Sequence, residues 1–347
     1  MVEWQPRVLL PSRYPSLDAG YLQEIGPYYL EEGIDYRVGD KLTENPHSWH
    51  RISNLLFIES PTAVGYSYNN DTTFEYNDAT TANDNLEAVL SFFNKFKEYQ
   101  GRKFFIAGES YAGKYIPDLA VLIDGHNLRG EGVNINLKAL LIGNGVMSFK
   151  YLQDSTYEFT IARRFVDPEI VHVYESSCRY DPESAGCRFF QIEYDKGTEE
   201  LNPYNVYSYC YYNDSFDLSG EVNKRRHRSQ ESILSEIKRQ LSGSPPNSKF
   251  NGAPCAYFDG IFDYFNLNEE AYHAKFKGQK WNGPCVEDIR YRIDTAGSIA
   301  SYRHLIGLIP TSRRIGLVLY NGNWDSVVPY GDSLKGLDML DLTSNYI

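Results

Sequence analysis

The chain has 347 residues, of which 42% are hydrophobic and 23% charged, so it can form one large core or a core with an insertion. Its net charge of -12 argues against nucleic acid and anionic membranes as partners. No stretch reaches the roughly 18 apolar residues that cross a bilayer, and the first residues lack the basic and apolar regions of a signal peptide. We therefore expect a globular chain that is cytosolic or whose true N-terminus lies upstream.

Short apolar runs without alternation predict strands of a sheet that is covered on both faces. They occupy residues 55–59, 103–107, 137–143 and 315–321. Between the first two, apolar residues recur at helical spacing over 82–99, and Gly101 stands where a C-terminal cap is expected. This order of strand, helix and strand predicts an α/β fold with a mainly parallel sheet and helices on both faces.

A different pattern begins near residue 149, where cysteines and a tyrosine-dense run at 204–212 replace the alternation of strands and helices. We expect an insertion or lid over residues 149–262, between an N-terminal part of the core at 1–148 and a C-terminal part at 263–347. Four of the five cysteines fall in this insertion, which predicts disulfides there and leaves one cysteine over. The cysteines are Cys178, Cys187, Cys210, Cys255 and Cys285.

Two sequons, at Asn70 and Asn213, predict N-glycosylation and favour a secretory history. Two are close to the number that chance provides in a chain of this length. The cysteine cluster points the same way, because disulfides persist in oxidising compartments.

The most informative motif is Gly108-Glu109-Ser110-Tyr111-Ala112-Gly113, because it follows an apolar strand and precedes a helix expected at 114–123. A nucleophile elbow needs this order, since a serine at a tight strand-to-helix turn has its hydroxyl exposed above the sheet. The small neighbours Gly108 and Ala112 let the backbone turn without collision. The alternative is a surface serine in a glycine-rich loop.

Several blocks in a fixed order resemble the serine carboxypeptidase family, whose fold is the α/β-hydrolase fold. The resemblance covers most of the chain and is most specific over residues 108–117. The blocks lie at residues 26–29, 44–49, 54–61, 64–68, 108–117, 143–145 and 320–329.

The resemblance implies roles for five residues. Ser110 matches the nucleophile and Asp325 the acid that orients a histidine, while the backbone N–H of Tyr111 would supply half of an oxyanion hole. Glu109 and Glu24 match two glutamates that hold the terminal carboxylate of a substrate at acidic pH. That pairing requires at least one protonated glutamate, because two carboxylates cannot hydrogen-bond to each other. Glu24 and Glu109 could otherwise be ordinary polar residues of a cleft wall.

Three departures from the family pattern argue against catalysis. The family's histidine follows the acid in a Gly-x-Gly-His-Met-like block, but no histidine follows Asp325, and none of the chain's seven histidines matches that block. Loss of a triad member costs on the order of 10⁴ to 10⁶ in rate.

Residues 9–16 replace the family's Asn-Gly-Gly-Pro-Gly-Cys run, which supplies the second oxyanion donor and the disulfide partner that Cys285 would have. The N-terminal part of the sheet is also missing, so we expect a chain truncated at both ends.

The sequence therefore predicts a serine-type carboxypeptidase by family, which would hydrolyse C-terminal peptide bonds through an acyl-enzyme at Ser110 but is inactive as this chain stands. The alternative is a non-catalytic protein that binds peptide C-termini or a protein partner. By family, we expect no metal or cofactor, no nucleic-acid or membrane partner, and a location in the secretory pathway, the lysosome or vacuole, or outside the cell. The sequence does not determine an oligomeric state.

Overall fold

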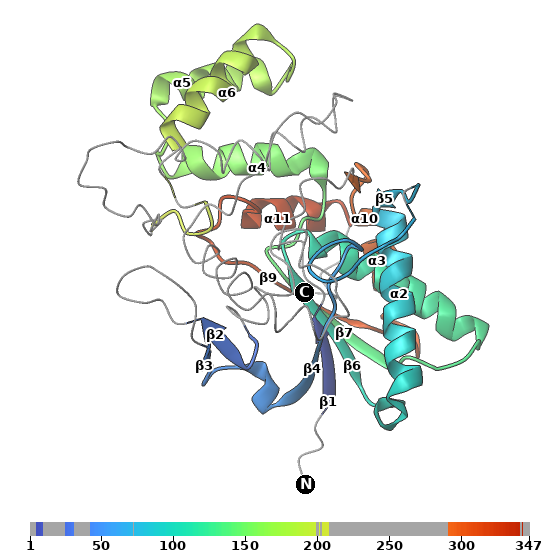
Figure 1. Cartoon of the computed structure of the whole chain (residues 1–347). Helices are drawn as coiled ribbons and strands as arrows, with labels where there is room; N and C mark the ends of the chain where they lie inside the picture. Colours follow the sequence, from blue (N-terminus) through green and yellow to red (C-terminus); the bar gives the residue numbers. More distant parts are fainter. Residues whose placement is uncertain are drawn as a thin grey trace.

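The computed structural model describes residues 5–9, 25–30, 42–71, 73–198, 201, 203–207, 291–340 and 342. Its centre is a parallel sheet of five described strands in the order β4-β1-β6-β7-β9 (Figure 1). These strands are β4 (Ser53–Phe57), β1 (Gln5–Leu9), β6 (Phe104–Glu109), β7 (Leu137–Gly143) and β9 (Gly316–Tyr320). The predicted parallel sheet is confirmed.

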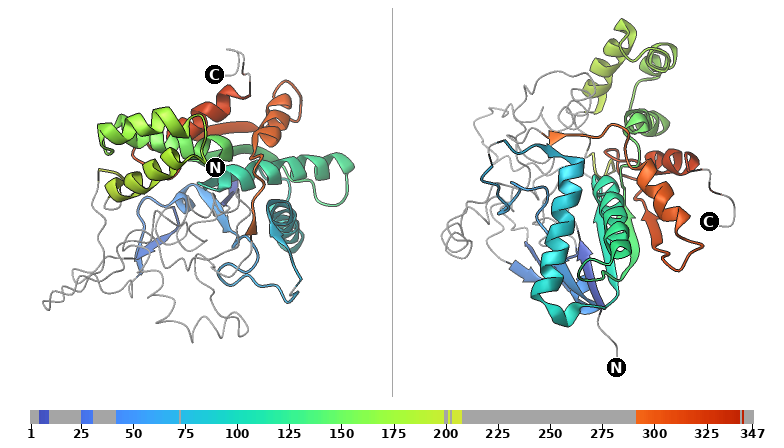
Figure 2. Two further views of the ribbon diagram at one scale, coloured as in Figure 1. Left: turned by 90° about the horizontal axis from the view of Figure 1, so that it is seen from above. Right: turned by 90° about the vertical axis from the view of Figure 1, so that its right-hand side faces the viewer.

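The helices α2 (Asp78–Lys95) and α3 (Ala112–Arg129) pack against each other, and α3 covers β6 and β7 (Figures 1 and 2). Buried aliphatic side chains of α3, such as Ile116 and Leu119, form one core with Ile106 of β6. Each fully buried side chain of this size contributes roughly 1.5 to 3 kcal/mol. The helix α10 (Ile299–Gly307) adds Tyr302 to the same core.

A helical layer lies beyond one end of the sheet and corresponds to the start of the predicted insertion (Figure 1). It comprises α4 (Phe149–Ala162), α5 (Pro168–Val173), a π-helical turn at Tyr174–Cys178 and α6 (Ala185–Thr198). Cys178 and Cys187 form a disulfide in this layer, with an S–S distance of 2.06 Å. Helix α11 (Tyr330–Asp338) packs against α4. The other three cysteines and the expected boundary at residue 262 lie outside the described residues.

Small elements complete the described fold. The strands β2 (Tyr28–Leu30) and β3 (Leu42–Glu44) form an antiparallel pair, and β5 (Tyr76–Asn77) pairs in parallel with β8 (Tyr291–Arg292). Two short 3-10 helices span Trp49–Arg51 and Lys97–Tyr99.

Three details differ from the sequence expectations. The strand β1 was not predicted, although it lies between β4 and β6 near the middle of the sheet. Helix α2 ends at Lys95 with Phe96 as its cap, so Gly101, with φ +74°, belongs to the turn after the following 3-10 helix. The strand β9 is not covered on both faces, because Val318 and Tyr320 are about half exposed.

The first turn of α3 packs directly on the loop that follows β7. A Cβ atom on Gly113 would lie 2.5 Å from the backbone nitrogen of Val146 and 2.6 Å from the carbonyl carbon of Gly145. Backbone atoms cannot move aside as a flexible side chain can, so only glycine fits this position.

A pair of substitutions in one helix tests this packing. We expect Gly113→Ala to lower the free energy of unfolding by at least about 2 kcal/mol, because the new methyl group overlaps backbone atoms. Gly125→Ala is the control, since its Cβ would meet only the Arg129 side chain at 3.5 Å. That variant should gain about 0.5 to 1 kcal/mol from the helix propensity of alanine. Urea unfolding of both variants makes the measurement, and equal effects would contradict the close contact.

Helix α11 is tied to the same loop by a buried carboxylate. Asp332 is fully buried, and its Oδ2 accepts the Met147 N–H at 3.0 Å. Burial raises the pKa of Asp332 to about 7, against the effect of its backbone donors. A group with a raised folded-state pKa binds a proton on folding, so its ionisation makes the protein less stable as pH rises through that value.

We therefore expect the protein to be more stable at pH 5 than at pH 7.5, with such a group contributing on the order of 2 kcal/mol to the difference. Asp332→Asn should reduce this pH dependence, because the variant has no charge to bury. Asp338→Asn, at an exposed position of the same helix, is the control and should leave it unchanged. Urea unfolding at the two pH values decides, and an undiminished dependence in Asp332→Asn would contradict the assignment.

Candidate active site

Ser110 lies in the turn between β6 and α3 and has a left-handed backbone, with φ +56°. Non-glycine residues seldom adopt this conformation, which occurs at nucleophile elbows. Three backbone hydrogen bonds hold it: the Ser110 N–H donates to Gly143 O at 3.0 Å, and the Ser110 carbonyl accepts from Gly113 N at 3.0 Å and Val146 N at 2.9 Å. Ser110 thus lies in a turn between a strand and a helix, in the order that the sequence predicts.

The register of the sheet brings three strand ends to one edge. Glu109 pairs with Gly143, and Gly143 pairs with Tyr320, so β6, β7 and β9 end side by side. The strand order also reverses between β1 and β6, and ligands of parallel α/β sheets bind at the carboxyl ends of strands at such a reversal. Ser110 is the first residue beyond β6 at this point.

Asn144 connects the end of β7, beside Ser110, to the loop after β9. Its N–H donates to Tyr320 O at 2.9 Å, and its Nδ2 donates to Gly322 O at 3.1 Å and to Val328 O at 3.0 Å. Its Oδ1 accepts Gly322 N at 2.8 Å. The sequence analysis placed Asn144 in a family block without giving it a role. Its position between two glycines after a strand was the available signal.

Asp325 lies in the loop that Asn144 holds. Its Oδ1 accepts the Val327 N–H at 2.7 Å and the Val328 N–H at 3.4 Å. Burial, with a smaller contribution from the nearby Glu109, raises the pKa of Asp325 to about 7, against the effect of these donors and of Asn144.

The loop around Asp325 is also held from the side of the helical layer. The Pro203 carbonyl accepts both the Ser326 N–H at 2.7 Å and the Ser326 hydroxyl at 2.8 Å. Val206 N donates to Trp324 O at 3.0 Å, and Arg163 Nη2 donates to Asn323 O at 2.7 Å. These contacts were not predicted, because they join segments more than 110 positions apart that share no sequence pattern.

No described histidine contacts Asp325. His126 Nε2 bonds to Val133 O at 3.0 Å, and His304 Nε2 bonds to the buried Asp124 at 3.0 Å. The other described histidines, His47, His50 and His172, are exposed on the β3–β4 connection and on α5. His227 and His273 lie outside the described residues.

The remaining predicted residues fall at different places. Glu109 is the last residue of β6 and is half-buried, while Tyr111 is buried just before α3. Asn70 is exposed on a loop, as a glycosylated asparagine must be. Glu24 and Asn213 lie outside the described residues. Within the described ranges, no group of three or more His, Cys, Asp or Glu side chains could hold a metal ion, and no helix is long and apolar enough to cross a membrane.

A family model and several similar proteins point to one family for this chain. A family model described as serine carboxypeptidase matches residues 15–345. Serine carboxypeptidase ctsa-4.1 of Caenorhabditis elegans is 34% identical, over 94% of this chain and 68% of its own length. Serine carboxypeptidase-like 42 of Arabidopsis thaliana is 30% identical, over 92% and 64%. Lysosomal protective protein of Mus musculus is 28% identical, over 89% and 65%.

The chain thus spans about two thirds of the length of these relatives. Among solved structures, the crystal structure of Kex1(delta)p, a prohormone-processing carboxypeptidase from Saccharomyces cerevisiae, covers 100% of this chain. The match has a TM-score of 0.65 at 23% identity and covers 70% of that structure, which supports the fold. The chain belongs to the serine carboxypeptidase family and has its α/β-hydrolase fold.

Proposed function

We propose that this site is a carboxypeptidase site for peptide C-termini, with Ser110 as nucleophile, Asp325 as the acid and the Tyr111 N–H as an oxyanion donor. The observation that carries the proposal is the left-handed backbone of Ser110 at the strand-to-helix turn, at the same sheet edge as the Asp325 loop. Ser110 Oγ would attack the scissile carbonyl and release the C-terminal residue as an amine, leaving an acyl-enzyme that water hydrolyses.

This reaction needs a base that takes the Ser110 proton and returns it to the leaving amine. A histidine beside Asp325 would do so, and none of the described histidines lies there. We therefore propose that the polypeptide of these 347 residues reacts slower than a complete triad by on the order of 10⁴ or more.

Glu109 suits a role in binding the substrate's terminal carboxylate. It is half-buried, immediately precedes the nucleophile and acts electrostatically on Asp325. A protonated carboxyl group can donate a hydrogen bond to a carboxylate, whereas an ionised one repels it. Binding through Glu109, with Glu24 as its proposed partner, would therefore strengthen at acidic pH.

A second candidate function is binding without hydrolysis. The backbone hydrogen bonds of Ser110 and the Asn144 bonds to the Asp325 loop hold the site in shape, although no base is described in it. A held site without a base suits binding of peptide C-termini without cleavage.

An oxidising compartment suits either function. The Cys178–Cys187 disulfide and the exposed Asn70 sequon support the secretory pathway, and one relative is named lysosomal protective protein. We propose the lysosome, the vacuole or the extracellular space as the location.

A fluorophosphonate probe tests the catalytic part of the proposal on the purified 347-residue polypeptide. We expect slow labelling that Ser110→Ala abolishes, since Ser110 is the reacting group. Asp325→Asn should change the labelling rate less than about twofold, because Asp325 has no base to orient. If a base were present, the same substitution would lower the labelling rate by close to 10⁴. Labelling as fast as that of an intact serine hydrolase, with a large loss in Asp325→Asn, would overturn the proposed inactivity. Labelling of Ser110→Ala would overturn the role of Ser110.

Calorimetric titration at pH 5 with one peptide in free-acid and amidated forms tests the ligand. We expect the free acid to bind at least about tenfold more tightly, because a charge-assisted hydrogen bond contributes roughly 1.5 to 3 kcal/mol. Glu109→Ala should remove that preference. Glu98→Ala is the control, because Glu98 is exposed and precedes the start of β6, whereas Ser110 follows its end. Equal binding of the two forms would contradict both candidate functions.

A further inference from the structure

A buried carboxylate beside the nucleophile turn has no role in the proposed chemistry. Asp78 is the first residue of α2 and is 3% exposed. Its Oδ1 accepts the hydroxyl of Tyr111 at 2.9 Å and the hydroxyl of Tyr291 at 2.8 Å, and its Oδ2 accepts the Asp294 N–H at 2.6 Å. One carboxylate therefore joins α2, the nucleophile turn and the segment after β8.

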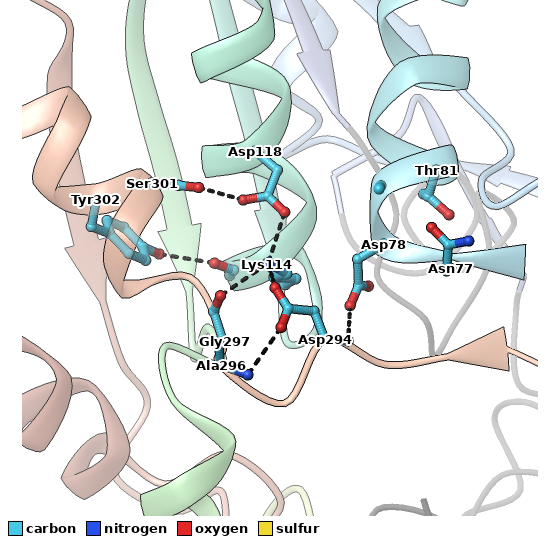
Figure 3. A network of polar contacts seen from close by, with 12 residues as sticks. Asn77, Asp78, Thr81, Lys114, Asp118, Asp294, Ala296, Gly297, Ser301 and Tyr302 are labelled. Atoms are coloured by element: carbon cyan, nitrogen blue, oxygen red, sulfur yellow. Dashed lines mark hydrogen bonds and ion pairs between the residues drawn. The ribbon is translucent and has the colours of Figure 1, made fainter.

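The same network reaches the first turn of α3 a second time, through Lys114 (Figure 3). Lys114 is buried, and its Nζ donates to Asp294 Oδ2 at 3.0 Å and Gly297 O at 2.9 Å and forms an ion pair with Asp118 at 2.9 Å. Asp118 also accepts the Ser301 hydroxyl. The turn after Ser110 is thus fastened by two of its side chains, Tyr111 and Lys114.

The contacts of Tyr111 and Lys114 matter because the backbone of Ser110 is in a strained, left-handed conformation. A left-handed non-glycine residue costs on the order of 1 to 3 kcal/mol and persists only where its surroundings hold it. Tyr111, the residue before α3, makes no side-chain capping bond to the helix. Its side chain points instead to Asp78, while its backbone N–H is the proposed oxyanion donor. The position of that N–H thus depends on where the phenol is anchored.

We propose that Asp78 is a positioning residue, which fixes the nucleophile turn and the Tyr111 amide through the Tyr111 hydroxyl. The proposal rests on the proposed function for the role of the amide, but the anchoring itself is independent of catalysis. The alternative is that Asp78 only ties buried segments together.

Two substitutions separate these possibilities. Tyr111→Phe and Tyr291→Phe each remove one phenol hydroxyl from the same Asp78 oxygen, at nearly equal distances. Both rings are buried, with 5% and 6% exposure, in one core cluster. Only Tyr111 is bonded to Ser110 through the chain, so Tyr291→Phe is the control. The Tyr291 hydroxyl also bonds to Thr81 Oγ1 at 3.0 Å, so this control removes at least as many hydrogen bonds as Tyr111→Phe.

Hydrogen exchange by mass spectrometry measures the turn without any reaction at Ser110. The reporting amides are Ser110, which donates to Gly143, and Gly113 and Lys114, which donate to Ser110 and Tyr111. We expect Tyr111→Phe to speed their exchange about tenfold, and Tyr291→Phe less than about twofold. The second variant should instead speed exchange in the segment 291–297. Equal acceleration of the turn in both variants, or none in Tyr111→Phe, would overturn the proposal.

The rate of fluorophosphonate labelling is the functional readout, because the probe also needs the oxyanion donor. We expect about a tenfold loss of labelling rate in Tyr111→Phe and less than about twofold in Tyr291→Phe, although Tyr291→Phe also loses its bond to Thr81 and should lose at least as much thermal stability. Equal losses in labelling would mean a merely structural role. If the unmodified protein does not label at all, the proposed function fails by itself, and the exchange measurement still decides whether Asp78 anchors the turn.

Discussion

The left-handed backbone of Ser110 is the constraint on which the site depends. Its carbonyl receives two N–H groups, from Gly113 and Val146, and its own N–H is taken by Gly143. These partners belong to α3 and to β7 with its following loop, so the turn exists only while α3 and β7 touch. The absence of a side chain at Gly113 and Gly145 makes that contact possible, because a Cβ at either position would meet atoms of the facing segment within about 3 Å.

The acid loop depends on the sheet in a different way. Asp325 is five positions beyond β9, too far for the strand alone to place it. Asn144 bridges the gap, since its amide side chain binds both Gly322 and Val328, before and after the acid. Ser110 and the loop of Asp325 therefore share one support, the end of β7. A small shift at the end of β7 would move Ser110 and the Asp325 loop together and would keep the distance between them. The site is then also sensitive to the hydrogen bond from Met147 N to Asp332, which holds the loop after β7.

Much of this arrangement could be predicted from the sequence. The runs that became β4, β6, β7 and β9 are apolar and short, and the Ser110 motif stands between a strand and a helix, so local pattern suffices for both. The strand β1 was not predicted, because its sequence, Gln5–Leu9, is short and begins with polar residues and a proline. The roles of Asn144, Asp78 and Pro203 could not be predicted either. They depend on hydrogen bonds between segments far apart in the sequence, and such bonds leave no periodic pattern in it.

The contact between Pro203 and Ser326 changes how the insertion should be regarded. Ser326 is 2% exposed and donates two hydrogen bonds to the Pro203 carbonyl, so the segment after the helical layer is held against the residue next to Asp325. An insertion attached only at its two ends could be exchanged between relatives as a separate module. Here Pro203 and Val206 form hydrogen bonds to the loop of Asp325 and help to hold it. A chimera that takes its insertion from another protein would have to keep this short stretch with the acid loop, or exchange the two together.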